Sequence, residues 1–136
     1  MIRMFEEKTA PLNSYEKKTL IPVMVACLKR HIGKGSAITN REMCEKMLDA
    51  GYTLDEIQVR KIINYIRNDN LVPCLIASQR GYYVTRDEAE LEEYIKSLED
   101  RIFAIMDVKF AMENQLEILK QELSTKDKNP DGQLAS

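Results

Sequence analysis

The stretch QVRKIINYIRNDNLVPCLIASQRGYYVT, residues 58–85, changes its periodicity halfway along its length. In its first half, apolar residues recur at the spacing of one helix face: Val59, Ile62, Ile63 and Ile66. In its second half, the β-rich run 71–77 and the segment 81–85 flank the turn SQRG, residues 78–81. The stretch therefore predicts a helix that is followed directly by a β-hairpin.

Capping boxes predict where the helices begin. Asn13 and Glu16 have the spacing of such a box and open a first helix over about 14–32. Pro22 lies inside this helix, so we expect either a kink there or a helix start near Ile21. The residues that would face inward share one stripe: Leu20, Met24, Cys27 and Leu28.

Two further helices are predicted before the hairpin. After a minimal strand at 37–38, Thr39 opens a second helix that runs to about Ala50 and ends at Gly51. We expect three residues of this helix to face inward: Met43, Met47 and Leu48. Asp55, with Gln58 three residues on, opens the third helix, over 55–69.

A long helix follows the hairpin. Thr85 and Glu88 have capping-box spacing, and a helical pattern without Gly or Pro then reaches about residue 124. The predicted fold is mainly α with a small β-hairpin: a winged helix-turn-helix followed by a long, coiled-coil-like C-terminal helix. The predicted parts are a flexible arm at 1–13, the winged helix-turn-helix domain at 14–85, an oligomerisation helix at 86–124 and a disordered tail at 125–136.

Residues 37–85 resemble the winged helix-turn-helix domains of the biotin-operon-repressor type. The resemblance is carried by Ala37-Ile38-Thr39, Val59-Arg60-Lys61, Ile63, Ile66-Arg67 and Gly81-Tyr82-Tyr83-Val84. Ile66 stands where that class usually has Leu. The chain is also similar to small bacteriophage-type DNA-binding proteins in which a long helix follows such a domain. The resemblance implies binding of double-stranded DNA by a transcriptional regulator or a replication factor.

The helix over 55–69 has the side chains that a DNA major groove requires on its polar face. Arg60 and Lys61 can contact phosphates or guanine, and Gln58 and Asn64 carry the paired donor and acceptor that adenine requires. Arg80 at the wing, residues 78–81, is expected to contact the minor groove or the backbone.

Two cations near the start of the second helix, Lys34 and Arg41, are expected to bind phosphates. Asp55 and Glu56 oppose this interpretation because they repel phosphate. The alternative is a winged-helix module for protein–protein interaction without direct DNA contact.

Apolar residues of the long helix follow a spacing of alternating four and three residues, which is the heptad seam of a coiled coil. The seam consists of Leu91, Ile95, Leu98, Ile102, Ile105, Lys109, Met112, Leu116, Leu119 and Leu123. We expect a homodimer or a higher homo-oligomer through this seam. Met106 and Val108 widen it, which fits an antiparallel or higher-order bundle better than a parallel zipper. Alternatively, the helix folds back on its own domain or binds a different protein.

Charge is distributed unevenly along the chain. Residues 1–85 carry 13 Lys and Arg against 9 Asp and Glu, a net charge of +4, whereas residues 86–136 carry 7 against 13, a net charge of −6. A basic first part and an acidic second part predict separate tasks for the two.

The composition points away from an enzyme, a secreted protein and a membrane protein. The chain has a single histidine, His31, and no C-x-x-C spacing, so we expect no metal, no cofactor and no catalytic residue. The run 20–28 is too short to span a bilayer. Cys27, Cys44 and Cys74 each lie in an apolar stretch, so we expect reduced core cysteines and a cytoplasmic location.

Overall fold

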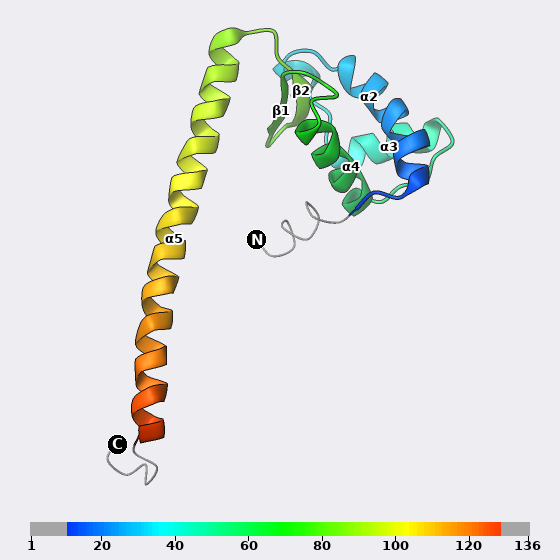
Figure 1. Ribbon diagram of the computed structural model, residues 1–136. Coiled ribbons are helices and arrows are strands. Elements are labelled where there is room, and N and C mark those ends of the chain that lie inside the picture. The colour runs from blue at the N-terminus through cyan, green and yellow to red at the C-terminus, as the bar shows by residue number, and fades with distance from the viewer. Residues whose placement is uncertain (1–10, 129–136) are drawn as a thin grey trace. The chain divides into compact units, whose positions relative to one another are not determined.

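The computed structural model describes residues 11–128, which are mainly helical, with one small antiparallel sheet and a long C-terminal helix (Figure 1). Its elements are η1 (Glu16–Leu20), α2 (Ile21–Lys29), η2 (Lys34–Ser36), α3 (Asn40–Asp49), α4 (Glu56–Asn68), β1 (Leu75–Ser78), β2 (Gly81–Val84) and α5 (Glu88–Lys128). Most of the arm predicted at 1–13 and most of the tail predicted at 125–136 lie outside the described residues.

The first helix begins at the predicted capping box. The Asn13 amide donates to Glu16 Oε1 at 2.8 Å, and the Glu16 amide donates to Asn13 Oδ1 at 2.8 Å. The turns of η1 have π-helical geometry, in which the Ile21 amide donates to the Glu16 carbonyl five residues earlier. This wider turn leaves room for the ring of Pro22, which would clash with a carbonyl in an ordinary α-helix. The helix therefore starts at Ser14 and not near Ile21, and the segment α2 continues it from Ile21, with Pro22 in its first turn.

The first helix ends at Lys29, three residues before the predicted end at Ile32. The chain leaves the helix because its backbone pairs with β2 instead. The Val84 amide donates to the His31 carbonyl at 2.8 Å, and the Gly33 amide donates to the Val84 carbonyl at 2.9 Å. His31 and Gly33 therefore bind the end of β2 and do not extend the helix.

The helices α3 and α4 begin at their predicted caps. Thr39 and Glu42 form a complete capping box, and the Asp55 carboxylate accepts from the Gln58 amide at 2.7 Å. Gly51, just beyond α3, has a φ of 96°, which glycine adopts without the strain that a Cβ would cause. The prediction that Leu48 faces inward is wrong, because Leu48 is 60% exposed, whereas its neighbour Met47 is buried.

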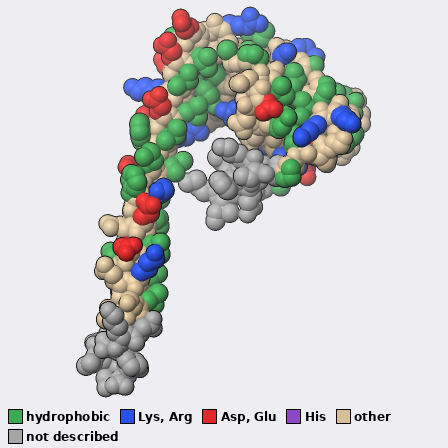
Figure 2. Space-filling model, in the orientation of Figure 1, with side chains coloured by type: hydrophobic (Ala, Val, Ile, Leu, Met, Phe, Trp, Pro, Cys, Tyr) green, Lys and Arg blue, Asp and Glu red, His purple; other side chains and the backbone are tan. Residues whose placement is uncertain are grey.

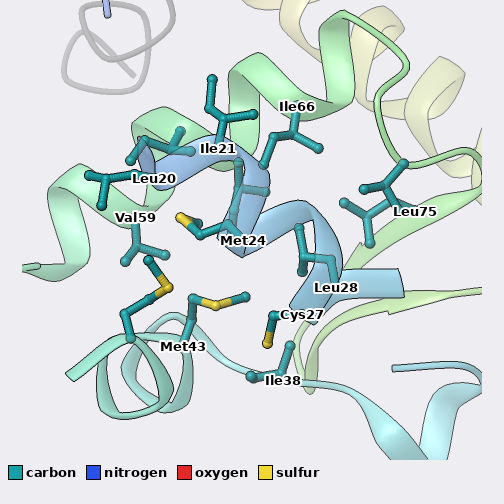
Figure 3. Packing of buried hydrophobic residues seen from close by; sticks show 14 of the residues in the cluster. Leu20, Ile21, Met24, Cys27, Leu28, Ile38, Met43, Val59, Ile66 and Leu75 are labelled. Carbon is teal, nitrogen blue, oxygen red and sulfur yellow. The ribbon is translucent and has the colours of Figure 1, made fainter. Parts of the chain in front are cut away.

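Side chains from α2, α3 and α4 form one hydrophobic core (Figure 3). Four α4 residues are fully buried at the predicted helical spacing: Val59, Ile62, Ile63 and Ile66. Fully burying an aliphatic side chain contributes about 1.5–3 kcal/mol relative to leaving it exposed. The apolar stripe that defines the helix in the sequence is therefore what fixes α4 against α2 and α3.

The hairpin is shorter than the sequence indicated. β1 begins at Leu75, not at residue 71, because Asn70 and Cys74 have φ values of 57° and 63° and turn the chain back before the strand. β1 pairs with β2 in an antiparallel register in which Ser78 faces Gly81. Of the two tyrosines of β2, Tyr83 is buried, and Tyr82 is half-buried and packs against the core cluster.

A third segment pairs with the sheet at Ile38, where the sequence predicts a minimal strand. The Ile38 amide donates to the Tyr82 carbonyl at 2.9 Å, and the Tyr82 amide donates to the Ile38 carbonyl at 2.8 Å. β2 therefore lies between β1 and Ile38. The sheet connects the segment before α3 to the hairpin after α4.

Gly81 permits this pairing. Its φ is 122°, and a Cβ added there would lie 2.4 Å from the Ile38 carbonyl oxygen and 2.8 Å from the Thr39 nitrogen. Both neighbours are backbone atoms, which cannot swing aside as a long side chain can. The hairpin turn is therefore held against the residue that caps α3.

The helix α5 begins at a different cap from the predicted one. The Asp87 carboxylate accepts from the Ala89 amide at 3.0 Å, while the Thr85 hydroxyl accepts from the Asp87 amide at 3.1 Å. Thr85 therefore orders the connecting segment, and Asp87 caps the helix. α5 continues to Lys128, so residues 125–128, predicted as tail, are helical.

The described chain divides into two units at Glu92 and Glu93, so that most of α5 is a unit of its own. Within residues 11–128, no helix combines the length and the apolar character needed to cross a membrane.

We predict that Gly81→Ala destabilises the first unit by about 1–3 kcal/mol, because the new methyl group meets the Ile38 carbonyl and the backbone is held at positive φ. Gly35→Ala is the matched control, since nothing lies within 4 Å of a Cβ there. Urea denaturation followed by circular dichroism measures both. Equal midpoints for the two variants would contradict the close approach at Gly81.

Candidate nucleic-acid interface

The helix α4 presents three faces. One is the buried stripe described above. A second carries Gln58, Lys61 and Tyr65, which face the first helical segment. The third, opposite the core, carries the exposed Ile57 and Asn68 and the half-buried Asn64. The third face is the most exposed of the three.

The second face of α4 binds a buried carboxylate. Glu16 is 1% exposed, and its Oε2 accepts from Gln58 Nε2 at 3.2 Å. Its Oε1 lies 3.1 Å from Lys61 Nζ and also accepts from the Asn13 amide. One turn along, Lys17 Nζ lies 6.0 Å from the centre of the Tyr65 ring, within the range of a cation–π interaction.

These contacts determine the ionisation of Glu16. Burial alone would raise the pKa of its carboxyl group, but hydrogen bonds from the Asn13 amide, Lys61 and Gln58 and the charge of Lys61 outweigh burial. The pKa of Glu16 therefore lies below its ordinary value of 4.5. Three donors from two segments of the chain thus stabilise the ionised form of this buried carboxylate.

Gln58 and Lys61 were predicted to contact DNA, and the structure gives both an intramolecular partner. The Lys61 side chain is only 22% exposed because it lies over Glu16. Their position indicates a role in fixing the orientation of α4. Sequence reasoning could not find this role, because Glu16 and Gln58 are 42 residues apart in the chain.

The outward face of α4 contains a residue that the sequence interpretation missed. Ile57 lies in the first turn and is 47% exposed. The signal was present, because Ile57 is apolar but falls outside the buried stripe. Arg60 and Asn64, both predicted to contact DNA, are half-buried on α4, and Arg60 makes a contact within the chain.

The hairpin turn touches the start of α3, and each of these two segments carries one of the predicted DNA contacts. Arg80 is exposed in the turn, where its amide donates to Ser78 Oγ at 3.2 Å. The next residue, Gly81, abuts Ile38 and Thr39. Arg41 is exposed two residues beyond Thr39. The structure therefore brings the segments that carry Arg80 and Arg41 side by side, although the two residues are far apart in sequence.

Lys34 is exposed in η2, which packs beside β2. His31 fixes this turn, because its Nδ1 donates to the Ser36 carbonyl at 2.7 Å. In that tautomer Nε2 faces the Cys27 thiol, 3.9 Å away. The single histidine thus orders the loop that carries Lys34.

The cysteines differ from one another. Cys27 is buried and Cys44 is half-buried against the core, but Cys74 is exposed, so its prediction as a core residue is wrong. Burial and the nearby carboxylates of Glu56 and Asp55 raise the pKa of the Cys44 thiol. Within residues 11–128, no group of three or more His, Cys, Asp or Glu is placed to hold a metal ion.

The predicted oligomerisation residues lie along α5. Five of them are about half exposed in the first and middle parts of the seam: Ile95, Ile102, Ile105, Met112 and Leu116. Leu119 is similarly exposed, and Leu98 is half-buried. Figure 2 shows hydrophobic side chains along the visible face of this helix.

Comparison of the chain with protein-family models, with curated proteins and with solved structures gives no match. The geometry described above is therefore the basis for inferring function.

The charge of Glu16 makes stability depend on pH. Because its folded pKa is below 4.5, its contribution is fully present above pH 4.5 and is lost as the pH falls through the folded pKa. We expect Glu16→Gln to lower the free energy of unfolding at pH 7 by about 1–3 kcal/mol, and this difference to shrink towards pH 3. Urea titrations across that range measure it.

Glu45→Gln, at an exposed position of α3, is the control and should change stability little at any pH. A Glu16→Gln difference that stays constant from pH 7 to pH 3 would mean that the carboxylate charge contributes nothing.

Proposed function

We propose that residues 14–85 form a winged helix-turn-helix domain that binds double-stranded DNA. The supporting order is helix, short strand, two helices and hairpin, with β2 between β1 and Ile38. The observation that carries the proposal is the contact of Gly81 with Ile38 and Thr39, which puts the wing, residues 78–81, beside the start of α3. A wing and a helix start that both carry exposed arginines form a surface suited to phosphates.

In this proposal α4 enters the major groove, and the other cations contact the backbone. Residues near the start of a recognition helix reach the bases, which favours Ile57 and Asn64 on the outward face and Arg60 on its flank. An exposed aliphatic side chain suits contact with a thymine methyl group, and an amide suits adenine. Lys34, Arg41 and Arg80 bind phosphates and fix the register of the domain on the duplex.

Gln58 and Lys61 act in this scheme mainly as positioning residues. By binding Glu16 they hold the first turns of α4 against η1, and so set the angle at which the outward face meets a groove. The acidic Asp55 at the start of α4 serves as its cap, which accounts for a carboxylate near the proposed phosphate surface.

The exposed seam of α5 supports association of two or more copies, so that paired domains bind paired sites. A cytoplasmic protein of the bacteriophage type, acting in transcription or replication, fits this combination of a DNA-binding domain and an assembly helix. The second candidate is a protein-interaction module, which the acidic and partly apolar α5 favours as the partner surface.

We predict that Arg41→Glu with Arg80→Glu weakens binding to a random-sequence duplex at least tenfold. Each lost phosphate contact should also lower the slope of log affinity against log salt by about 0.9. Fluorescence anisotropy across a salt series measures both quantities. The matched control is Lys29→Glu with Lys46→Glu, the same charge change at exposed positions in the last turns of α2 and α3.

If both double variants lose affinity equally, binding follows net charge and not this surface. If the parent chain binds no duplex at low salt, the interaction module becomes the better explanation.

We predict that two nearby substitutions on α4 affect different properties, one the stability of the domain and the other its binding to DNA. Lys61→Met should lower the free energy of unfolding, by about 1–3 kcal/mol, because it leaves a buried carboxylate without its cation. Asn64→Ala should leave stability nearly unchanged and weaken DNA binding. Urea denaturation and fluorescence anisotropy on both variants separate the two roles. A Lys61→Met protein that is as stable as the parent but has lost affinity for DNA would indicate that Lys61 contacts DNA directly.

A further inference from the structure

The apolar surface of α5 is widest in its middle. Between residues 102 and 112, large apolar side chains are exposed at seven positions: Ile102, Phe103, Ile105, Met106, Val108, Phe110 and Met112. The seam itself runs from Leu91 to Leu123, and its midpoint is Asp107. The widest apolar region therefore coincides with the centre of the seam.

We infer that the occupant of this surface is a second copy of α5, packed antiparallel and centred on Asp107. This inference rests on the proposed assembly of the protein through α5 and specifies its direction and register. In an antiparallel coiled coil, a positions of one helix pack against d positions of the other. Centring on Asp107 pairs all ten seam positions in this way, whereas a shift by one heptad leaves seam residues at both ends without partners.

Lys109 favours the antiparallel direction. It occupies an a position, and in a parallel dimer a positions face their own copies, so two ammonium groups would meet inside the seam. In the antiparallel register Lys109 lies across from Ile105 of the second copy. Its ammonium group then remains with Glu113 on its own helix, to which it donates at 2.9 Å.

The residues that flank the seam favour the same direction. In a parallel dimer, Met106 would face Arg101, and Val108 would face Glu113 of the other copy. In the antiparallel register, Met106 faces Met106 and Val108 faces Val108 across the two-fold axis. Met106 and Val108, which flank the middle of the seam, therefore contact apolar residues and not charged groups.

The uneven distribution of negative charge distinguishes the two directions as well. Residues 88–101 contain six acidic and two basic residues, a net charge of −4, and residues 113–126 contain three and two, a net charge of −1. Antiparallel packing puts each strongly acidic half beside a weakly acidic one, which reduces repulsion. It also puts Glu92 opposite Lys120 of the second copy, once at each end.

Disulfide cross-linking tests the direction and the register together. Glu92→Cys and Lys120→Cys are made in separate full-length chains, one of them enlarged by a tag, and both carry Cys74→Ser to remove the exposed native thiol. After mixing and mild oxidation, we expect the mixed dimer as the main cross-linked product. Each variant oxidised alone should give little cross-linked dimer, because the two copies of the same introduced cysteine lie far apart along the axis of the coiled coil.

Cross-linking of each variant to itself would overturn the proposal in favour of parallel packing. A dimer by light scattering that forms no mixed cross-link would overturn the register. A monomeric parent chain would overturn the proposal that a second copy of α5 covers this surface. DNA binding by the parent chain, measured separately by anisotropy, reports on the DNA-binding proposal in every one of these cases.

Discussion

The buried carboxylate of Glu16 is the interaction on which the orientation of α4 depends. It accepts from the Asn13 amide in its own capping box, and it binds Gln58 and Lys61 on α4. An uncompensated charge in the interior would be strongly destabilising, so the first helical segment and α4 must stay together for the carboxylate to remain satisfied. The apolar stripe of α4 would tolerate small rotations about the helix axis, whereas two directed contacts to one carboxylate restrict them.

The backbone contact at Gly81 performs the corresponding task for the hairpin. A two-stranded hairpin alone is marginally stable in water, and here β2 gains a second neighbour in Ile38. Since Ile38 immediately precedes the Thr39 cap, the same residues end the sheet and begin α3. The turn that carries Arg80 is consequently positioned by backbone atoms of the segment that leads to Arg41. Each proposed DNA contact thus lies on a segment fixed by the interior of the domain.

The sequence predicted the features that depend on neighbouring residues. The caps at Asn13, Thr39 and Asp55, the buried face of α4 and the extended segment at Ile38 all follow from short patterns. The errors arose where local patterns compete or where distant residues decide. Asp87 caps α5 in place of Thr85, whose hydroxyl accepts from the Asp87 amide and not from an amide of the helix. The roles of Gln58 and Lys61 depend on Glu16, more than forty residues earlier, and no helical pattern within α4 could reveal that partner.

The length of α5 has a consequence for what an antiparallel pair would span. At about 1.5 Å per residue, the two Glu88 positions of such a pair lie about 57 Å apart. Half-sites read by compact dimers are separated by about 34–36 Å, one turn of the double helix. In the proposed DNA-binding assembly, attachment points this far apart suit binding to two separate stretches of DNA. The long helix would then act as a spacer between the points at which the two proposed DNA-binding domains are attached.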